Sequence, residues 1–268
     1  MKFYNLALIV LLLLTTACKN EKTSTHVESI NYAEEELDVT TTIYPEAVTR
    51  VFDAHGGLDT WQQMKTLKFT MPKPSGDEVT TTDLQHRYSL IQMPNHDIGF
   101  DGSDVWLHKK DTATYQGKPK FYYNLMFYFY AMPFVLADDG IIYEETDPLV
   151  FEGQSYPGIK VSYESGVGES PDDEYILYYD SKTHKMAWLG YTVTYFSKEK
   201  GKEFHFIKYS SWQEANGLLL PETLTWYHYE NNLPTTKRND VQFVNVTIDT
   251  NKLEPSLFKK PENATIVE

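Results

Sequence analysis

A nearly uninterrupted apolar segment in the middle of the chain restricts most strongly how this protein can fold. Of the 17 residues from Phe121 to Ala137, only Asn124 and Pro133 are neither apolar nor aromatic. A helix that is apolar on every side must be buried in a protein or lie in lipid. The segment is short for a membrane span and contains a proline and four tyrosines, so we favour a buried helix over a membrane-spanning one. Pro133 should kink or end this helix and could begin a short second one.

Most of the remaining chain predicts strands that follow one early helix. Pro45 suits the first turn of a helix, and Gly56 and Gly57 suit its end. Extended segments then follow at short spacing, separated by turn signals such as Asp101-Gly102 and Asn216-Gly217. The expected strands cover residues 67–71, 79–91, 105–107, 175–179, 186–196, 202–213, 218–230 and 241–249. This order is typical of a meander of antiparallel strands.

The longest expected strands carry apolar residues on both faces. Trp188 is followed by Leu189, and Trp226 by Tyr227. A sheet with one solvated face would alternate apolar and polar residues. We therefore expect a strongly curved sheet, closed or partly closed into a barrel, whose concave side is covered by residues 121–137.

The first residues of the chain are typical of a secreted, lipid-anchored protein. Lys2 and the apolar run from Leu6 to Leu14 are followed by small residues and by Cys18, the only cysteine. This end resembles the lipobox of bacterial lipoproteins, although Thr15 stands where the motif usually has leucine. We expect residues 1–17 to be a signal peptide and Cys18 to be the lipid attachment site. A plain secretory signal with a chance cysteine and an uncleaved anchor are the alternatives.

The segment after the cysteine predicts a tether rather than a folded element. Residues 18–43 are rich in lysine, asparagine, glutamate, serine and threonine and offer little surface to bury. We expect them to form a lipidated flexible tether that carries a single domain, residues 44–268. Two small domains in place of one are the alternative, since about 225 residues allow either.

Composition and motifs argue against several classes of function. The net charge of -14 makes nucleic acid an unfavourable partner. Nucleophile elbows, phosphate loops and zinc spacings are missing from the sequence, so we predict a protein that is not an enzyme and needs no cofactor or metal. His205 and His228 could lie on neighbouring strands, but a surface or half-buried role is favoured over metal binding. The acidic run from Asp172 to Glu174 could bind calcium, but a solvated loop is favoured.

Several short motifs follow one another along the chain in a recognisable order: His55-Gly56-Gly57, Phe100-Asp101-Gly102, Met132-Pro133-Phe134, Tyr178-Tyr179-Asp180, Asn216-Gly217-Leu218 and Leu257-Phe258. This order resembles that of the LolA/LolB-like lipoprotein carriers of the bacterial envelope, and especially the LolA-like lipoproteins of Bacteroidetes-type bacteria. The resemblance covers roughly residues 45 to 262. It implies a mainly β fold with few helices: an unclosed antiparallel β-barrel, with a helical lid on its concave side and a cavity for acyl chains.

The resemblance implies a membrane-anchored envelope lipoprotein, at the outer membrane, that binds or transfers a lipid or another apolar ligand in the half-barrel cavity. Its expected partners are the membrane, through the N-terminal lipid, the ligand itself, and an envelope protein. The alternatives are a scaffold or interaction lipoprotein whose core is filled by its own side chains, and an enzyme with an unrecognised site. The ligand-binding candidates, large aromatics on the lid or on long strands, are Phe127, Tyr130, Phe134, Trp188 and Trp226.

Overall fold

The structure is a computed structural model that describes residues 44–163, 173–195 and 203–267. All of the described residues belong to one compact unit. The predictions for the signal peptide, Cys18 and the tether lie outside the described residues, as does Asp172 of the acidic run. In the part of the chain that is described, no helix is both long and apolar enough to cross a membrane.

Two short helices precede the sheets, and the sequence predicted the first of them. Helix α1 (Glu46–Ala54) follows Pro45 and buries Val48, Val51 and Phe52, whereas α2 (Leu58–Gln63) buries Trp61. Between them, Gly56 has a φ of 105°, and a Cβ atom there would lie 2.2 Å from the carbonyl oxygen of Gly217. Only glycine therefore allows the end of α1 to approach the turn after residue 215 so closely.

The first sheet contains seven strands, most of them from the first half of the described chain. Its order is β13 (Val244–Asp249), β1 (Thr66–Met71), β2 (Glu78–Asp83), β3 (Ser89–Gln92), β4 (His96–Phe100), β5 (Val105–Lys109) and β14 (Thr265–Ile266).

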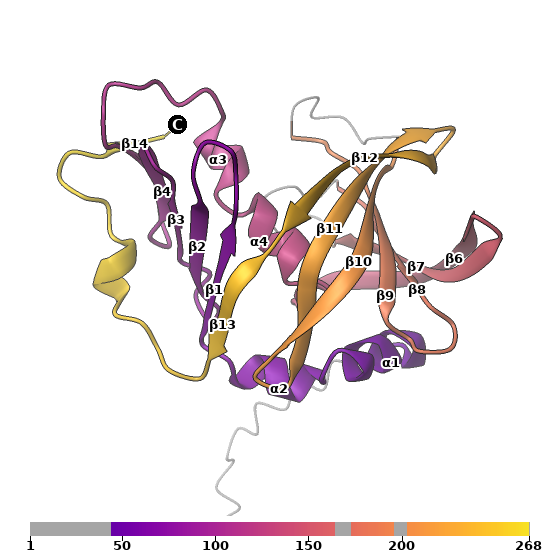
Figure 1. The fold of residues 1–268 in the computed structure, drawn as a ribbon. Helices are drawn as coiled ribbons and strands as arrows, with labels where there is room; N and C mark the ends of the chain where they lie inside the picture. The colour runs from indigo at the N-terminus through magenta and orange to yellow at the C-terminus, as the bar shows by residue number, and fades with distance from the viewer. Residues whose placement is uncertain (1–43, 164–172, 196–202, 268) are drawn as a thin grey trace, which may run out of the picture. The chain divides into compact units, whose positions relative to one another are not determined.

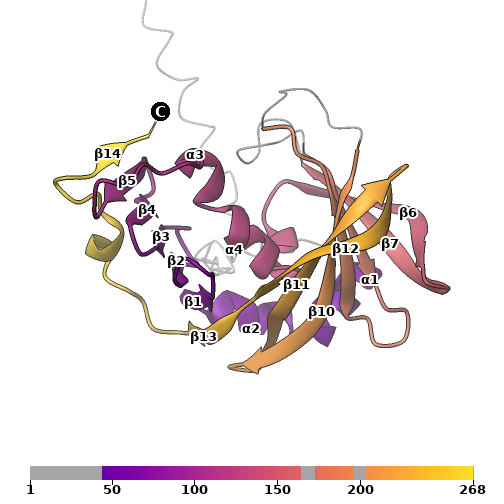
Figure 2. The same cartoon turned by 45° about the horizontal axis from the view of Figure 1, so that its top comes forward.

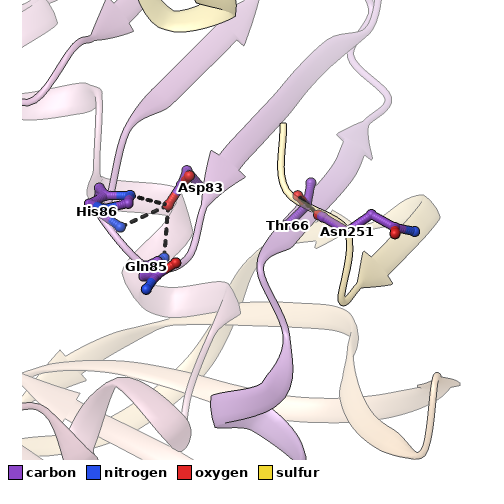
Figure 3. Close-up of polar contacts among 5 residues, drawn as sticks. All are labelled: Thr66, Asp83, Gln85, His86 and Asn251. Carbon is purple, nitrogen blue, oxygen red and sulfur yellow. Dashed lines mark hydrogen bonds and ion pairs between the residues drawn. The ribbon is translucent and has the colours of Figure 1, made fainter. Parts of the chain in front are cut away.

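The single strand predicted at residues 79–91 is wrong, because the chain turns between β2 and β3. The carboxylate of Asp83 accepts hydrogen bonds from the backbone N–H groups of Gln85 and His86 at 2.9 and 2.8 Å, which closes that turn (Figure 3). At the same end of the strands, the hydroxyl of Thr66, opposite Asp83, donates to the carbonyl of Asn251 at 2.7 Å and ties the end of β13 to β1 (Figure 3).

The second sheet is the predicted meander. Its strands neighbour one another in chain order: β6 (Ile141–Phe151), β7 (Gln154–Tyr163), β8 (Tyr175–Tyr179), β9 (Met186–Tyr191), β10 (His205–Ala215), β11 (Leu218–Glu230) and β12 (Leu233–Gln242). The sequence did not predict β6, β7 or most of β12. The predicted strand at 241–249 begins within β12 and ends with β13, since only Phe243 separates these two strands.

The predicted fold class is confirmed: the chain is mainly β, antiparallel and unclosed, with few helices. Among the described strands, β6 and β12 are the edges of one sheet and β13 and β14 the edges of the other. Both views place helix α4 between the two sheets (Figure 1 and Figure 2). Strands β12 and β13 follow each other directly, so the chain passes from one sheet to the other at Phe243.

The lid, predicted at residues 121–137, begins at Pro119 and is less regular than predicted. It forms α3 (Pro119–Tyr122), α4 (Leu125–Tyr130) and the 3₁₀-helix η2 (Phe134–Ala137). The predicted interruption at Pro133 is confirmed, but the single helix before it is wrong, because the chain also breaks at Tyr123 and Asn124.

Tyrosine hydroxyls compensate for the broken helix. Short helices leave backbone carbonyls without partners. The hydroxyl of Tyr209 donates to the carbonyl of Phe129 at 2.7 Å, and that of Tyr44 to Ala137 at 3.1 Å. The hydroxyl of Tyr143 donates to the carbonyl of Leu136. These bonds let an irregular segment lie in an apolar interior without unsatisfied carbonyls at these three positions.

Candidate functional site

Three of the five predicted ligand residues fill the space between the sheets. Phe127, Tyr130 and Phe134 are at most 1% exposed. Phe134 stacks on Trp61 with ring centroids 4.8 Å apart. Tyr130 packs between Phe69 and Phe243 at 4.4 and 4.5 Å. Much of the interior of the half-barrel is therefore occupied by the protein's own side chains.

The two predicted tryptophans lie apart from each other. Trp188 is fully buried on the other face of the second sheet, beneath Phe151 at 4.8 Å and the ammonium group of Lys208 at 5.3 Å. Trp226 is half-buried beside the lid, 5.8 Å from the ring of Phe129. The prediction that the long strands are apolar on both faces is confirmed, since each face of the second sheet has an apolar cluster of its own.

A pocket opens beside the lid, where α3 and α4 face the ends of three strands. Its volume is about 810 Å³, including the space at its open mouth. The lid contributes Lys120, Phe121, Asn124, Leu125, Tyr128 and Phe129. Strands β7 to β9 and the residues next to them contribute Tyr163, Asp173, Tyr175, Tyr191, Thr192, Val193 and Tyr195. None of the five predicted ligand residues lines this pocket, although Trp226 contacts its wall.

The walls of the pocket are mostly aromatic, and the rings hold one another in place. The rings of Phe121 and Tyr195 pack against each other in the pocket wall, with their centroids 4.9 Å apart. Phe129 lies 4.9 Å from Tyr191, whose hydroxyl accepts a hydrogen bond from the indole N–H of Trp226 at 3.2 Å. These contacts join the lid to strands β9 and β11. They give the pocket an aromatic wall that exists before a ligand arrives.

Asp173 is the acidic group of the pocket. Its side chain is only 9% exposed, and its Oδ1 atom accepts a hydrogen bond from the backbone N–H of Thr194 at 2.7 Å. Nearby, the hydroxyl of Thr192 accepts from the backbone N–H of Glu174 at 2.9 Å. The solvated loop expected here is therefore wrong for Asp173. Its carboxylate is held in a fixed position at the pocket instead.

Three of the pocket tyrosines, Tyr163, Tyr175 and Tyr191, are neutral at physiological pH. Burial raises the pKa of Tyr163, and its tyrosine neighbours and Asp173 add to this. Burial, followed by the charge of Asp173, raises the pKa of Tyr175. Burial also raises the pKa of Tyr191. The field of the Asp173 carboxylate thus reaches the phenols around it.

A polar cluster holds α3 against the first sheet. The carboxylate of Glu78 is 2% exposed and accepts a hydrogen bond from the hydroxyl of Tyr122 at 2.6 Å. Lys73 pairs with Glu78 and also donates to the Tyr122 hydroxyl at 3.0 Å. Burial, followed by Glu78, raises the pKa of Tyr115 to about 12. Because Tyr122 lies between Lys120 and Leu125, this cluster fixes the lid side of the pocket.

His205 and His228 lie on the paired strands β10 and β11, as the sequence suggested. Among the described residues, no group of three or more histidine, cysteine, aspartate or glutamate side chains could hold a metal ion. The ring of His205 stacks on Tyr191 at 5.3 Å, and burial lowers its pKa. His228 is exposed.

The match to a family model covers the sheet and lid that form the pocket. The model described as a family of unknown function, DUF6503, matches residues 104–255, more than half of the 268 residues. The chain belongs to the DUF6503 family. All of the pocket residues lie within the DUF6503 match. A comparison with curated proteins gives no match.

Solved structures are similar to this DUF6503 chain in fold. A LolA superfamily protein from Nitrosomonas europaea has 7% identity and a TM-score of 0.47, with 80% of this chain and 96% of that chain covered. A DUF1329 family protein from Desulfovibrio piger has 10% identity and a TM-score of 0.46, covering 80% and 98%. A putative outer membrane lipoprotein-sorting protein domain from Vibrio parahaemolyticus has 10% identity and a TM-score of 0.34, covering 75% and 95%.

Proposed function

We propose that residues 44–268 bind an apolar or amphiphilic ligand, such as a lipid, in the pocket between the lid and strands β7 to β9. The supporting observation is the lining of this pocket, in which nine of 13 residues are apolar or aromatic and four are polar or charged. Small-molecule sites have this character: their walls are mostly apolar and aromatic, and a few polar groups orient the ligand. Each buried CH₂ group contributes about 0.8 kcal/mol, so a short hydrocarbon chain is enough for measurable binding.

The rest of the proposal places this pocket in the cell envelope. Removal of residues 1–17 and lipidation of Cys18 would anchor the protein to the outer membrane through the tether of residues 18–43. A domain on such a tether can reach lipids of the same membrane or an envelope protein partner. We propose binding or transfer rather than catalysis as its role.

A scaffold role is the second candidate, and the filled interior favours it. Phe127, Tyr130 and Phe134 occupy the space in which a carrier of long acyl chains would hold its cargo. A scaffold lipoprotein needs no free cavity. The two roles differ in whether the pocket beside the lid takes up a ligand.

Uptake of a neutral apolar probe separates these roles. The full chain with Cys18→Ser, purified without detergent, is titrated with diphenylhexatriene, which fluoresces in apolar surroundings. Leu125 lines the pocket and Ile142 is 44% exposed on β6 outside it. We expect Leu125→Glu to weaken uptake at least about tenfold, because a charge in an apolar site is costly, and Ile142→Glu to leave it unchanged. If the chain that carries only Cys18→Ser takes up no probe, the scaffold role is favoured. If both variants lose uptake equally, binding in this pocket is contradicted.

A further inference from the structure

The pocket beside the lid presents two phenol hydroxyls whose protons meet no acceptor in the described part of the chain. We propose that the ligand is a neutral apolar molecule with a carbonyl oxygen, an ester or a ketone, which accepts hydrogen bonds from the hydroxyls of Tyr163 and Tyr175. This inference rests on the proposed function, and it adds the polar group of the ligand. The carbonyl can belong to a free ketone or to the ester of a lipid.

The register of three strands places three tyrosines on one face of the second sheet. Tyr175 on β8 is paired with Val161 on β7 and with Tyr191 on β9. Tyr163 lies two residues beyond Val161, and successive side chains of a strand alternate between the two faces. The three tyrosines therefore share a face, and all three line the pocket. The rings of Tyr163 and Tyr175 are 6.1 Å apart and nearly perpendicular to each other.

The hydroxyls of Tyr163 and Tyr175 differ from the hydroxyls that hold the lid. Tyr209 donates to a lid carbonyl at 2.7 Å. Among the described residues, neither Tyr163 nor Tyr175 makes a hydrogen bond through its hydroxyl. The hydroxyl of Tyr130 also lacks a partner there, but it is enclosed in the core. Tyr163 and Tyr175 are partly exposed and line the pocket, so a ligand can reach them. Burial raises the pKa of both phenols, so each keeps its proton and acts as a donor.

A carbonyl oxygen suits this pair of donors. It has two lone pairs and no proton, so one carbonyl can accept hydrogen bonds from both phenols. Tyr191 and Thr192 add further donors, because their oxygens accept the indole N–H of Trp226 and the backbone N–H of Glu174 and keep their own protons. A hydrocarbon without an acceptor would displace water from these hydroxyls and leave them unpaired, which costs free energy. The lining therefore favours a ligand that carries an acceptor.

The acceptor on the ligand is neutral rather than a carboxylate. A carboxylate could accept from the same phenols, but burying its charge costs more than burying a carbonyl group. The net charge of -14 also repels anions from the chain. Lys120, the lysine of the lining, is exposed on α3, so water screens its attraction for an anion.

Displacement of diphenylhexatriene tests the role of the two phenols. The full chain with Cys18→Ser is loaded with this probe, which carries no acceptor, and is titrated with methyl octyl ketone. In the double variant Tyr163→Phe, Tyr175→Phe, we expect the affinity for the ketone to fall at least about fivefold more than the affinity for diphenylhexatriene. The reason is that each neutral hydrogen bond contributes a factor of about two to ten. Tyr227→Phe removes a hydroxyl on the other face of the sheet and should change neither affinity.

A second measurement does not depend on the folding of the variants. The infrared C=O stretch of the bound ketone should lie at a lower wavenumber than in hexane, because donated hydrogen bonds weaken the C=O bond. Decanoate should bind more weakly than the ketone.

Four results would overturn the inference but not the proposed function, provided that diphenylhexatriene binds. They are no displacement by the ketone, a C=O stretch equal to that in hexane, an equal loss of both ligands in the double variant, and tighter binding of decanoate. A monodecanoyl glycerol that binds more tightly than the ketone assigns the carbonyl to a lipid ester; the reverse order assigns it to a free ketone.

Discussion

The histidine at the end of α1 should make the domain less stable as the pH falls. His55 is fully buried, and its Nδ1 lies 2.7 Å from the carbonyl oxygen of Val51. Its Nε2 atom accepts the backbone N–H of Met186 at 3.4 Å. The neutral ring with its proton on Nδ1 satisfies both contacts. A second proton on Nε2 would face the Met186 N–H, and burial would leave the charge unsolvated.

The size of this effect follows from the pKa of His55. Burial, opposed in part by the Val51 bond, lowers this pKa from 6.5 to about 4. Above pH 6.5 the ring is neutral in both the folded and the unfolded chain. As the pH falls below 6.5, the unfolded chain binds a proton that the folded chain does not, so stability is lost until the pH passes about 4. The difference between the pKa values of His55 in the unfolded and the folded chain corresponds to about 3 kcal/mol of unfolding free energy.

Urea unfolding between pH 8 and pH 4 can measure this contribution if a variant removes the titrating group. Carboxylates also titrate in this range, so the quantity to compare is the difference in unfolding free energy between the wild-type chain and His55→Gln. Glutamine does not titrate. We expect His55→Gln to be less stable at pH 8 and to lose about 3 kcal/mol less than the wild type on going to pH 4. Parallel pH profiles for the two proteins would refute the buried neutral histidine.

Three further changes test other parts of the structure. Gly56→Ala should lower the unfolding free energy by about 2 kcal/mol or more in urea titrations, because its Cβ would lie 2.2 Å from the Gly217 oxygen. The control Gly153→Ala also has a positive φ but open space around it, and should cost less. Phe134→Ala should cost about 3–5 kcal/mol without changing diphenylhexatriene affinity in the folded protein, as its ring fills the core and not the pocket. Cys18→Ser should abolish incorporation of labelled fatty acid and release the protein from membranes, and continued labelling would contradict the lipobox hypothesis.

The strands that the sequence predicted correctly are those with clear turns and buried residues. Strands β10 and β11 flank Asn216-Gly217, the strongest hairpin signal, and their apolar residues enter the core. Strands β6 and β12 are edges with mostly exposed side chains, so their sequences show little apolar alternation. Their pairing depends on backbone hydrogen bonds to a neighbour, which no local pattern of side chains reveals.

The candidate site was harder to predict, because both faces of the second sheet are apolar. Trp188 and Leu189 point to opposite faces, and each face has its own cluster. Nothing in the sequence shows which face the lid covers, and a shift of one residue reverses every side chain. Asp173 could not be distinguished from its acidic neighbours, since its burial depends on contacts with Thr194, which is 21 residues away.

The lid itself did contain a signal for the pocket. Lys120 and Asn124 are four residues apart, and Leu125, Tyr128 and Phe129 continue the same helical side. Met126, Phe127 and Tyr130, on the other side, are buried in the core, as is Phe129, which lines the pocket as well. Polar residues at helical spacing therefore mark the side of an apolar segment that reaches solvent. One segment can therefore fill the interior with one side and form a pocket with the other, which reconciles a filled half-barrel with a ligand site at its border.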